Sequence, residues 1–177
     1  MKNKIKKITV IRAILLALIT FVMVIIFALS AQAGEDSGET SAGFTAFVLN
    51  IFGINEDNTA PEKLQKIEGF VRTLAHFSEY AALGLLSTLL LRTYCIKRRW
   101  ALCFAVSFSA LYAVTDEIHQ IFVPGRAAQF SDWLVDTSGA LCGSLLVFAL
   151  AFTAACINKW CKKPRKLKNK KKLKKSR

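Results

Sequence analysis

Four long apolar stretches constrain the fold of this chain more than any other feature of its sequence. They cover about Ile8–Leu29, Phe70–Leu91, Trp100–Val123 and Trp133–Ile157. Each has roughly 20 residues or more, the length that an α-helix needs to cross about 30 Å of hydrocarbon. Inside lipid, only helices and closed barrels satisfy their own backbone hydrogen bonds. We therefore predict an all-α polytopic membrane protein, built as a four-helix bundle.

The composition excludes several other classes of protein. Of the 177 residues, 53% are hydrophobic, which is more than a soluble domain of this size usually needs and far more than a disordered chain has. The five cysteines show no pairing pattern, so a secreted scaffold held by disulfides is excluded. The remaining class is a membrane protein with reduced thiols.

The positions of the charges predict the orientation of the bundle. Of the 25 Lys and Arg residues, 21 lie in the N-terminal segment Lys2–Arg12, the connection Arg92–Arg99 and the tail Lys159–Arg177. None of the 12 acidic residues lies in these three segments. By the positive-inside rule, both termini are expected in the cytoplasm and the acidic residues on or toward the outer side. The basic tail is expected to anchor on anionic lipid, because no folded module presents it to nucleic acid.

These observations predict four parts of the chain. Residues 1–29 form a basic N-terminus and the first helix, 30–69 an extracytoplasmic loop, 70–157 the other three helices, and 158–177 a basic cytoplasmic tail. The first helix has an alternative interpretation, because Ala31-Gln32-Ala33 resembles the cleavage site of a secretory signal. The apolar stretch Ala13–Leu29 is longer than the usual apolar region of such a signal, which favours an uncleaved helix.

Ionisable residues inside three of the stretches are the candidates for function, since such residues are costly in hydrocarbon. At helical spacing they form three one-sided stripes: Arg72, His76 and Glu79; Tyr112, Asp116 and His119, with Glu117 and Gln120 adjoining; and Asp132 and Asp136, followed by Gly139 and Gly143. The two glycines form a G-x-x-x-G pattern that predicts close helix contact. The position of each stripe along its helix predicts one shared polar pocket in the outer half of the membrane.

Two arginines border the predicted pocket. A planar guanidinium suits the oxygens of a phosphate, so Arg72 and Arg126 indicate a phosphate or pyrophosphate head group as one candidate ligand. Pro124-Gly125 favours a tight turn that would fold Arg126 back over the pocket. The other hypothesis is that Arg72 pairs with Glu79 or an aspartate and only holds helices together.

The two histidines allow two kinds of chemistry. His76 with Glu79, and His119 with Asp116, are pairs separated by three positions. Such His–carboxylate pairs act as metal ligands in helical bundles or as acid/base units. One candidate cofactor is a divalent metal ion held by Glu79, Asp116, Asp132 or Asp136. The sequence leaves open whether any metal is bound, and it contains no P-loop or nucleophile elbow.

Three motifs resemble those of the VanZ-like family. They are Ser30-Ala31-Gln32-Ala33-Gly34, Arg72-Thr73-Leu74-Ala75-His76-Phe77-Ser78-Glu79-Tyr80 and Thr115-Asp116-Glu117-Ile118-His119-Gln120-Ile121-Phe122-Val123-Pro124-Gly125-Arg126, followed by Asp132, Asp136 and Gly139. The resemblance covers roughly Ser30–Gly143. It implies a small multi-pass protein of the bacterial cell membrane, in a family whose founding member is associated with resistance to the glycopeptide teicoplanin.

The resemblance also implies an activity, because the family's fold has been related to that of lipid head-group enzymes. The expected substrate is a phosphate-containing lipid or a lipid-linked cell-envelope precursor at the outer leaflet. The implied catalytic residues are His76, Glu79, Asp116, Glu117, His119, Asp132 and Asp136, and the implied substrate contacts are Arg72, Tyr80, Gln120 and Arg126. Membrane lipids are expected partners, nucleic acid is not, and the oligomeric state stays open.

The alternative is a protein without catalytic activity that binds or sequesters an anionic amphiphile or a lipophilic glycopeptide. In that case the acidic loop Gly34–Glu68 would carry recognition. A proton-coupled transporter is less favoured, because the four stretches show no evident repeat.

Overall fold

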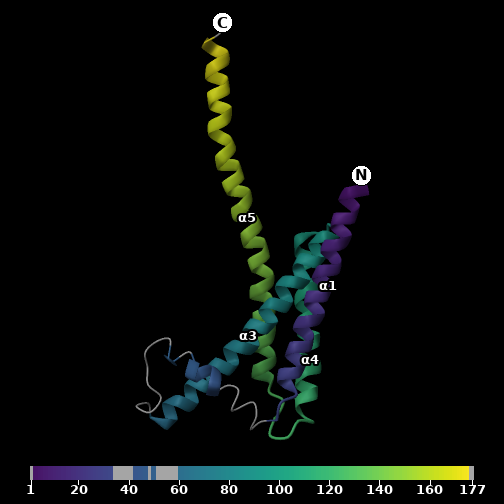
Figure 1. The fold of residues 1–177 in the computed structure, drawn as a ribbon, viewed down its shortest axis with the longest axis vertical. Helices are drawn as coiled ribbons and strands as arrows, with labels where there is room; N and C mark the ends of the chain where they lie inside the picture. The colour runs from purple at the N-terminus through teal and green to yellow at the C-terminus, as the bar shows by residue number, and fades with distance from the viewer. Residues whose placement is uncertain (1, 34–41, 48, 51–59, 176–177) are drawn as a thin grey trace.

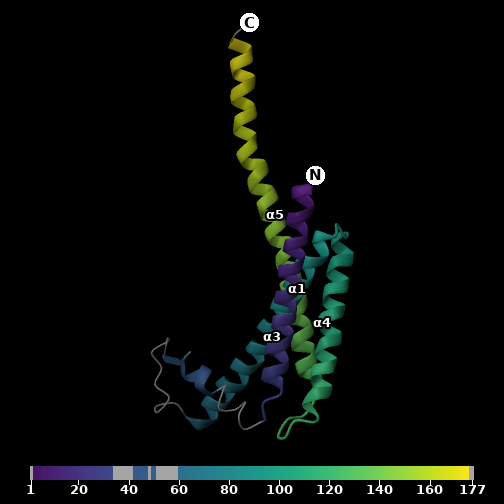
Figure 2. The same ribbon diagram turned by 45° about the vertical axis from the view of Figure 1, so that its right-hand side comes forward.

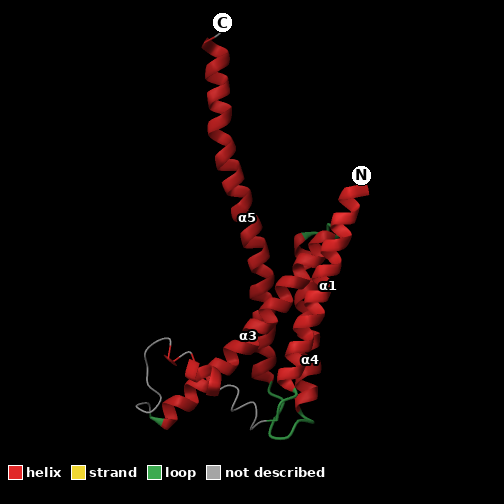
Figure 3. Cartoon of the chain, in the orientation of Figure 1, coloured by secondary structure: helices red, strands yellow, loops and turns green. Residues whose placement is uncertain are grey.

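The computed structural model is all-helical and describes residues 2–33, 42–47, 49–50 and 60–175, with side chains described from residue 5 to residue 153 of these ranges. Its long helices, shown in Figure 1 and Figure 3, are α1 (Lys2–Ser30), α3 (Pro61–Thr93), α4 (Arg98–Gln120) and α5 (Phe130–Lys175). Four segments are long and apolar enough to cross a membrane: Ile5–Ser30, Pro61–Thr93, Arg98–Gln120 and Phe130–Thr153. These findings confirm the all-α class and the four apolar helices. Most of the acidic loop Gly34–Glu68 lies outside the described residues.

α3 extends beyond the apolar stretch that predicted it. It begins at Pro61, not at Phe70, with proline in the first turn, where its missing N–H costs nothing. The added turns are polar, and Lys66 pairs with Glu62 at 2.7 Å across one turn. Apolar content therefore located the part of the helix suited to hydrocarbon and missed its polar beginning.

α4 ends at Gln120, short of the predicted Val123, because a tight turn follows it. The backbone N–H of Arg126 donates to the carbonyl of Val123 at 3.1 Å, and Gly125 has a φ of 74°. Proline followed by glycine with positive φ is the pattern of a type II turn. The turn predicted from Pro124-Gly125 is confirmed, and it sends the chain directly back toward α5.

α3 and α5 form the most extensive helix pair of the bundle. Glycines make this contact close: a Cβ added at Gly143 would overlap the carbonyl oxygen of Ala81, and one at Gly139 would overlap that of Phe77. The close approach predicted from the G-x-x-x-G pattern is therefore confirmed, with α3 as the partner. The polar stripes of α3 and α5 are brought together by this contact.

Figure 2 shows α1 alongside the other helices of the bundle, and polar contacts join it to α3 and α4. Near one end, Arg12 donates to the side chain and carbonyl of Thr93 at 3.1 and 2.9 Å, and its guanidinium lies 3.7 Å from the ring centre of Tyr94. Nearer the other end, the hydroxyl of Tyr112 donates to the carbonyl of Met23 at 2.7 Å. The buried core between the helices contains Ile19, Ile26, Tyr80, Leu83, Ala113 and Ala140.

Both chain ends and the connection between α3 and α4 lie at the same end of the bundle, and the connection between α4 and α5 lies at the opposite end (Figure 1). Many large apolar side chains point outward, for example Val24, Phe104 and Leu111 with 58%, 54% and 68% of their surface exposed. Such exposure is typical of helices whose neighbour is hydrocarbon and not water.

Candidate functional site

Helix packing brings three of the predicted site residues together, one from each of three helices. His76 lies on α3, Asp116 on α4 and Asp136 on α5, and one ligand atom of each lies within 4.8 Å of the other two. The Nδ1 atom of His76 is 3.8 Å from Oδ1 of Asp136. Only 4% of Asp116 and none of Asp136 is exposed. This group, called the buried cluster below, has the residue types that could hold a metal ion.

A polar pocket lies next to the buried cluster. It has a volume of about 220 Å³ and is lined by Arg72, Thr73, His76, Gln129, Asp132 and Val135. His76 belongs to both the pocket and the cluster. Its Nδ1 is buried on the side of the cluster, and the side chain also lines the pocket. The pocket thus combines a guanidinium, a carboxylate and an imidazole around one small volume.

Arg72 has unused hydrogen-bond donors. The ion pairs among the described residues are Glu62–Lys66 and His76–Asp136. Within this part of the chain, no carboxylate lies within 4.0 Å of the Arg72 guanidinium. The hypothesis that Arg72 pairs with Glu79 or an aspartate is therefore not what the structure shows. A half-buried guanidinium with free donors on a pocket wall can bind an anionic group directly.

Arg126 has different partners from those that the sequence suggested. Its Nε donates to the carbonyl of Gln32 at 3.2 Å and its terminal nitrogen to the carbonyl of Leu29 at 3.1 Å. These contacts satisfy carbonyls at the C-terminal end of α1, where a cation is favoured. Burial, and secondly the nearby Arg72, lowers the pKa of the Arg126 guanidinium, which nevertheless stays charged. Arg126 does not line the polar pocket.

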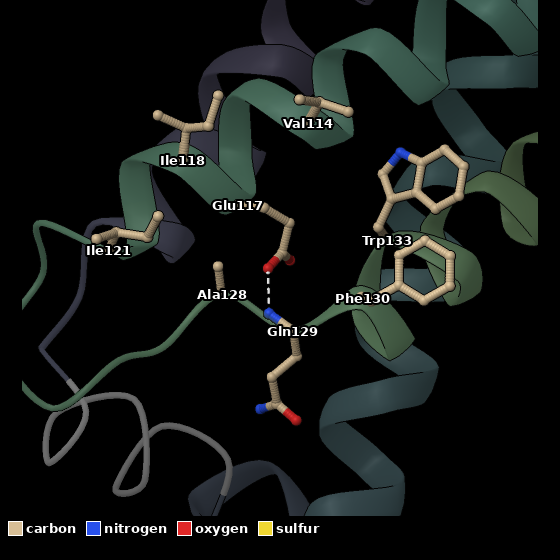
Figure 4. A pocket seen from close by; sticks show the side chains of 8 residues that line it. All are labelled: Val114, Glu117, Ile118, Ile121, Ala128, Gln129, Phe130 and Trp133. Atoms are coloured by element: carbon tan, nitrogen blue, oxygen red, sulfur yellow. Dashed lines mark hydrogen bonds between the residues drawn. The ribbon is translucent and has the colours of Figure 1, made fainter.

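Glu117 lies between α4 and the beginning of α5. Its Oε2 accepts the backbone N–H of Gln129 at 2.7 Å, as the dashed line in Figure 4 shows. The same side chain lines a second cavity of about 380 Å³, whose other walls are Val114, Ile118, Ile121, Ala128, Gln129, Phe130 and Trp133. This cavity is mainly apolar, and Gln129 borders both it and the polar pocket. Glu117 therefore holds in place the segment around Gln129, which borders both the apolar cavity and the polar pocket.

Tyr80 and Gln120 were predicted to contact a substrate, and both are buried. Tyr80 is 0% exposed and belongs to the core. Gln120 donates from Nε2 to Oγ of Ser30 at 3.0 Å and to Oδ2 of Asp116 at 3.4 Å. Neither side chain lines the polar pocket. Gln120 instead connects the end of α1 to the buried cluster.

His119 and Glu79 also lie outside the polar pocket. The ring of His119 stacks on Phe27, with 4.6 Å between ring centres. Glu79 is half-buried and makes no ion pair with the described residues. Of the two histidines, only His76 therefore combines exposure to the pocket with carboxylates beside it.

Three residues of the polar pocket were not among the predicted site residues: Thr73, Gln129 and Val135. None is ionisable, so a search for charges inside apolar stretches passes over them. Thr73 follows Arg72 in the first helical motif, and this position was the only available signal for it. Gln129 belongs to the loop before α5, and its place depends on the hydrogen bond from its backbone to Glu117.

A family model described as VanZ/LLP1 matches residues 15–152, which include every residue of the buried cluster and the polar pocket. No curated protein and no solved structure matches the chain significantly.

Proposed function

This chain belongs to the VanZ/LLP1 family, and from that premise we propose that it is a multi-pass enzyme of the bacterial cell membrane. Its substrate is a lipid or a lipid-linked cell-envelope precursor with a phosphate-containing head group. The reaction is hydrolysis or transfer of that head group at the outer leaflet. The observation that carries the proposal is the polar pocket, in which Arg72, His76 and Asp132 line one volume of about 220 Å³.

The orientation follows from the charges. The basic N-terminus and the connection between α3 and α4 lie at the end of the bundle from which the basic tail extends, and the positive-inside rule assigns that end to the cytoplasm. The connection between α4 and α5 is at the other end, and its Gln129 lines the pocket. A head group in the outer leaflet then reaches the pocket without crossing the hydrocarbon.

Each polar residue of the pocket has a role in this reaction. Arg72 binds the phosphate oxygens and stabilises the charge that develops on them. Asp132 accepts the proton of the attacking hydroxyl, which belongs to water or to an acceptor molecule. The new oxygen–phosphorus bond forms as the bond from phosphorus to the leaving oxygen breaks, and His76 gives that oxygen a proton from Nε2. Asp136, behind the imidazole, orients the ring.

The test uses full-length protein in proteoliposomes with head-group-labelled bacterial lipids, and measures the release or transfer of label. We expect His76→Ala to lower turnover about 100-fold or more, as expected for loss of a proton donor. His119→Phe, which keeps an aromatic ring against Phe27, should lower turnover less. Ser78→Ala is a control, because that exposed hydroxyl bonds only to its own helix.

The outcomes distinguish the proposal from its alternative. Binding of labelled lipid or of teicoplanin without any turnover would contradict the enzyme and support the alternative, a protein that sequesters its ligand. Normal turnover by His76→Ala would remove the imidazole from the reaction. As a cellular readout, we expect expression of the wild-type chain to reduce susceptibility to teicoplanin and expression of the His76→Ala variant to have no such effect.

A further inference from the structure

The buried cluster contains acidic groups that the described residues compensate only in part. Asp136 is 0% exposed, and neither of its carboxylate oxygens has a hydrogen-bond partner within the part of the chain that the structure describes. Nδ1 of His76 lies 3.8 Å from Oδ1 of Asp136 and is also buried, with no hydrogen-bond partner from the described residues. A buried carboxylate without donors loses its hydration and gains nothing in return, which costs several kcal/mol in ordinary cases.

Asp116 adds a second acidic group to the buried site. It is 4% exposed, and its hydrogen-bond donors are two neutral side chains, Ser30 and Gln120, the latter at 3.4 Å from Oδ2, at the long end of the range for a hydrogen bond. Its carboxylate lies within 4.8 Å of the ligand atoms of His76 and Asp136. Among the described residues, no lysine or arginine forms an ion pair with either aspartate. Two acidic groups therefore share one site of low dielectric constant, where a cation would be strongly stabilised.

The donor set identifies the kind of cation. One imidazole nitrogen and two carboxylate oxygens are ligands typical of Zn²⁺ and Mn²⁺ in proteins, and carboxylate–histidine sets from separate helices hold metals in helical bundles. With bonds of about 2.1 Å, two ligands of one ion lie at most about 4.2 Å apart. Small rotations of the three side chains would have to close the observed spread of up to 4.8 Å. We propose that Nδ1 of His76 and the carboxylates of Asp116 and Asp136 bind one divalent transition-metal ion inside the bundle.

The site differs from the set that the sequence suggested. Asp132 lines the polar pocket, and Glu79 is outside the group whose ligand atoms converge. The ion lies behind His76 as seen from the pocket, because the aspartates that hold it are almost completely buried. It therefore keeps the proton of the imidazole on Nε2 and makes that N–H a stronger donor to a ligand in the pocket. This consequence rests on the proposed function, whereas metal binding itself does not.

The experiment measures metal binding by the full-length protein, purified in detergent without a histidine tag. The protein is stripped with EDTA and titrated with Zn²⁺, Mn²⁺ or Mg²⁺, and the bound metal per chain is measured by mass spectrometry. We expect about one Zn²⁺ or Mn²⁺ per chain, a higher thermal midpoint with the metal, and weaker binding of Mg²⁺, which seldom takes an imidazole ligand.

The variants test the ligands one by one. Asp136→Asn and His76→Gln should each weaken metal binding more than about 100-fold, because loss of a ligand costs more than loss of an outer-shell partner. Glu117→Gln is the matched control: Glu117 is the neighbour of Asp116 on α4 and is also buried, but it is bonded to Gln129 instead. It should keep the ion. If Asp136→Asn does not fold, the number of metal ions bound per wild-type chain and the metal affinity of His76→Gln still test the site.

Wild-type protein that binds no ion at micromolar concentrations, with a midpoint unaffected by EDTA, would overturn the metal site. Equal binding by the wild type and both ligand variants would do the same. The proposed function is tested separately. A protein that binds the metal ion but shows no lipid turnover would support the metal site and contradict the proposed reaction. Turnover by EDTA-stripped protein keeps the reaction and removes the ion's proposed effect on the imidazole, and the titration alone decides whether the metal site exists.

Discussion

Arg72 and Arg126 show how two residues of the same type acquire different roles in one pocket region. Both were expected to hold a phosphate, since both flank the polar stripes. Arg126 instead donates to the carbonyls of Leu29 and Gln32 at the end of α1, whereas Arg72 lines the polar pocket and forms no ion pair with the residues that the structure describes. The difference follows from the type II turn at Pro124-Gly125, which directs Arg126 toward α1.

This difference predicts opposite phenotypes for two alanine variants. Arg126→Ala should lower the stability of the folded protein by about 1.5 to 3 kcal/mol, because it removes hydrogen bonds made by a charged group. Arg72→Ala should leave stability near that of the wild type and lower the affinity for pyrophosphate about 10-fold or more, through loss of similar interactions with the ligand. Thermal unfolding and isothermal titration in detergent measure the two effects. Weaker pyrophosphate binding by Arg126→Ala at unchanged stability would contradict the assignment.

The contact between α3 and α5 determines the geometry of the site at the scale of helices. Gly139 lies against Phe77, the neighbour of His76, and one turn after Asp136. The close approach of the two backbones therefore sets the 3.8 Å distance between His76 and Asp136. Larger residues at the glycine positions would push α3 and α5 apart and increase the distance between His76 and Asp136.

We expect Gly143→Ala to destabilise the protein by about 1 to 3 kcal/mol, because the added methyl group would overlap the carbonyl oxygen of Ala81. Gly69→Ala is the matched control on α3: nothing lies within 4 Å of its added Cβ, and alanine is the better helix former, so stability should stay equal or increase. Thermal unfolding of both variants in the same detergent is the measurement. Equal destabilisation by the two substitutions would show that helix contact is not the cause.

At the scale of the whole molecule, the arrangement of the connections separates two chemical environments. The basic N-terminal segment and the connection between α3 and α4 lie at one end of the bundle, and the loop that borders both cavities lies at the other. The structure describes four segments long and apolar enough to cross a membrane, and an even number of crossings would place both termini on one side. We propose that this side is the cytoplasm, because the charge pattern then follows the positive-inside rule.

Cysteine labelling tests this orientation in intact cells. Cys95 is exposed in the connection between α3 and α4, and Ala127 is exposed in the connection before α5. In variants with every other cysteine replaced by serine, a membrane-impermeant maleimide should label Ala127→Cys and should leave Cys95 unlabelled. Permeabilised cells, in which both should react, are the control. Labelling of Cys95 from outside would reverse the proposed orientation.

The sequence by itself determined the helices and several of their contacts. Apolar length fixed the class and the approximate positions of the helices, because the thickness of hydrocarbon sets a minimum span. Small residues at Gly139 and Gly143 predicted a close helix contact, and Pro124-Gly125 predicted a tight turn, because both depend on local sterics. The polar beginning of α3 at Pro61 could not be found in this way, because it contributes nothing to apolar content.

The tertiary structure decided which of the polar stripes meet. Spacing along a helix shows which residues share a face, but it does not show how far that helix is rotated against its neighbours. His76 and His119 had equivalent patterns in the sequence, yet only His76 faces the polar pocket, and His119 stacks on Phe27. The convergence of His76, Asp116 and Asp136 depends on the packing of three helices. Such packing arises from contacts between residues far apart in the chain, which no local pattern encodes.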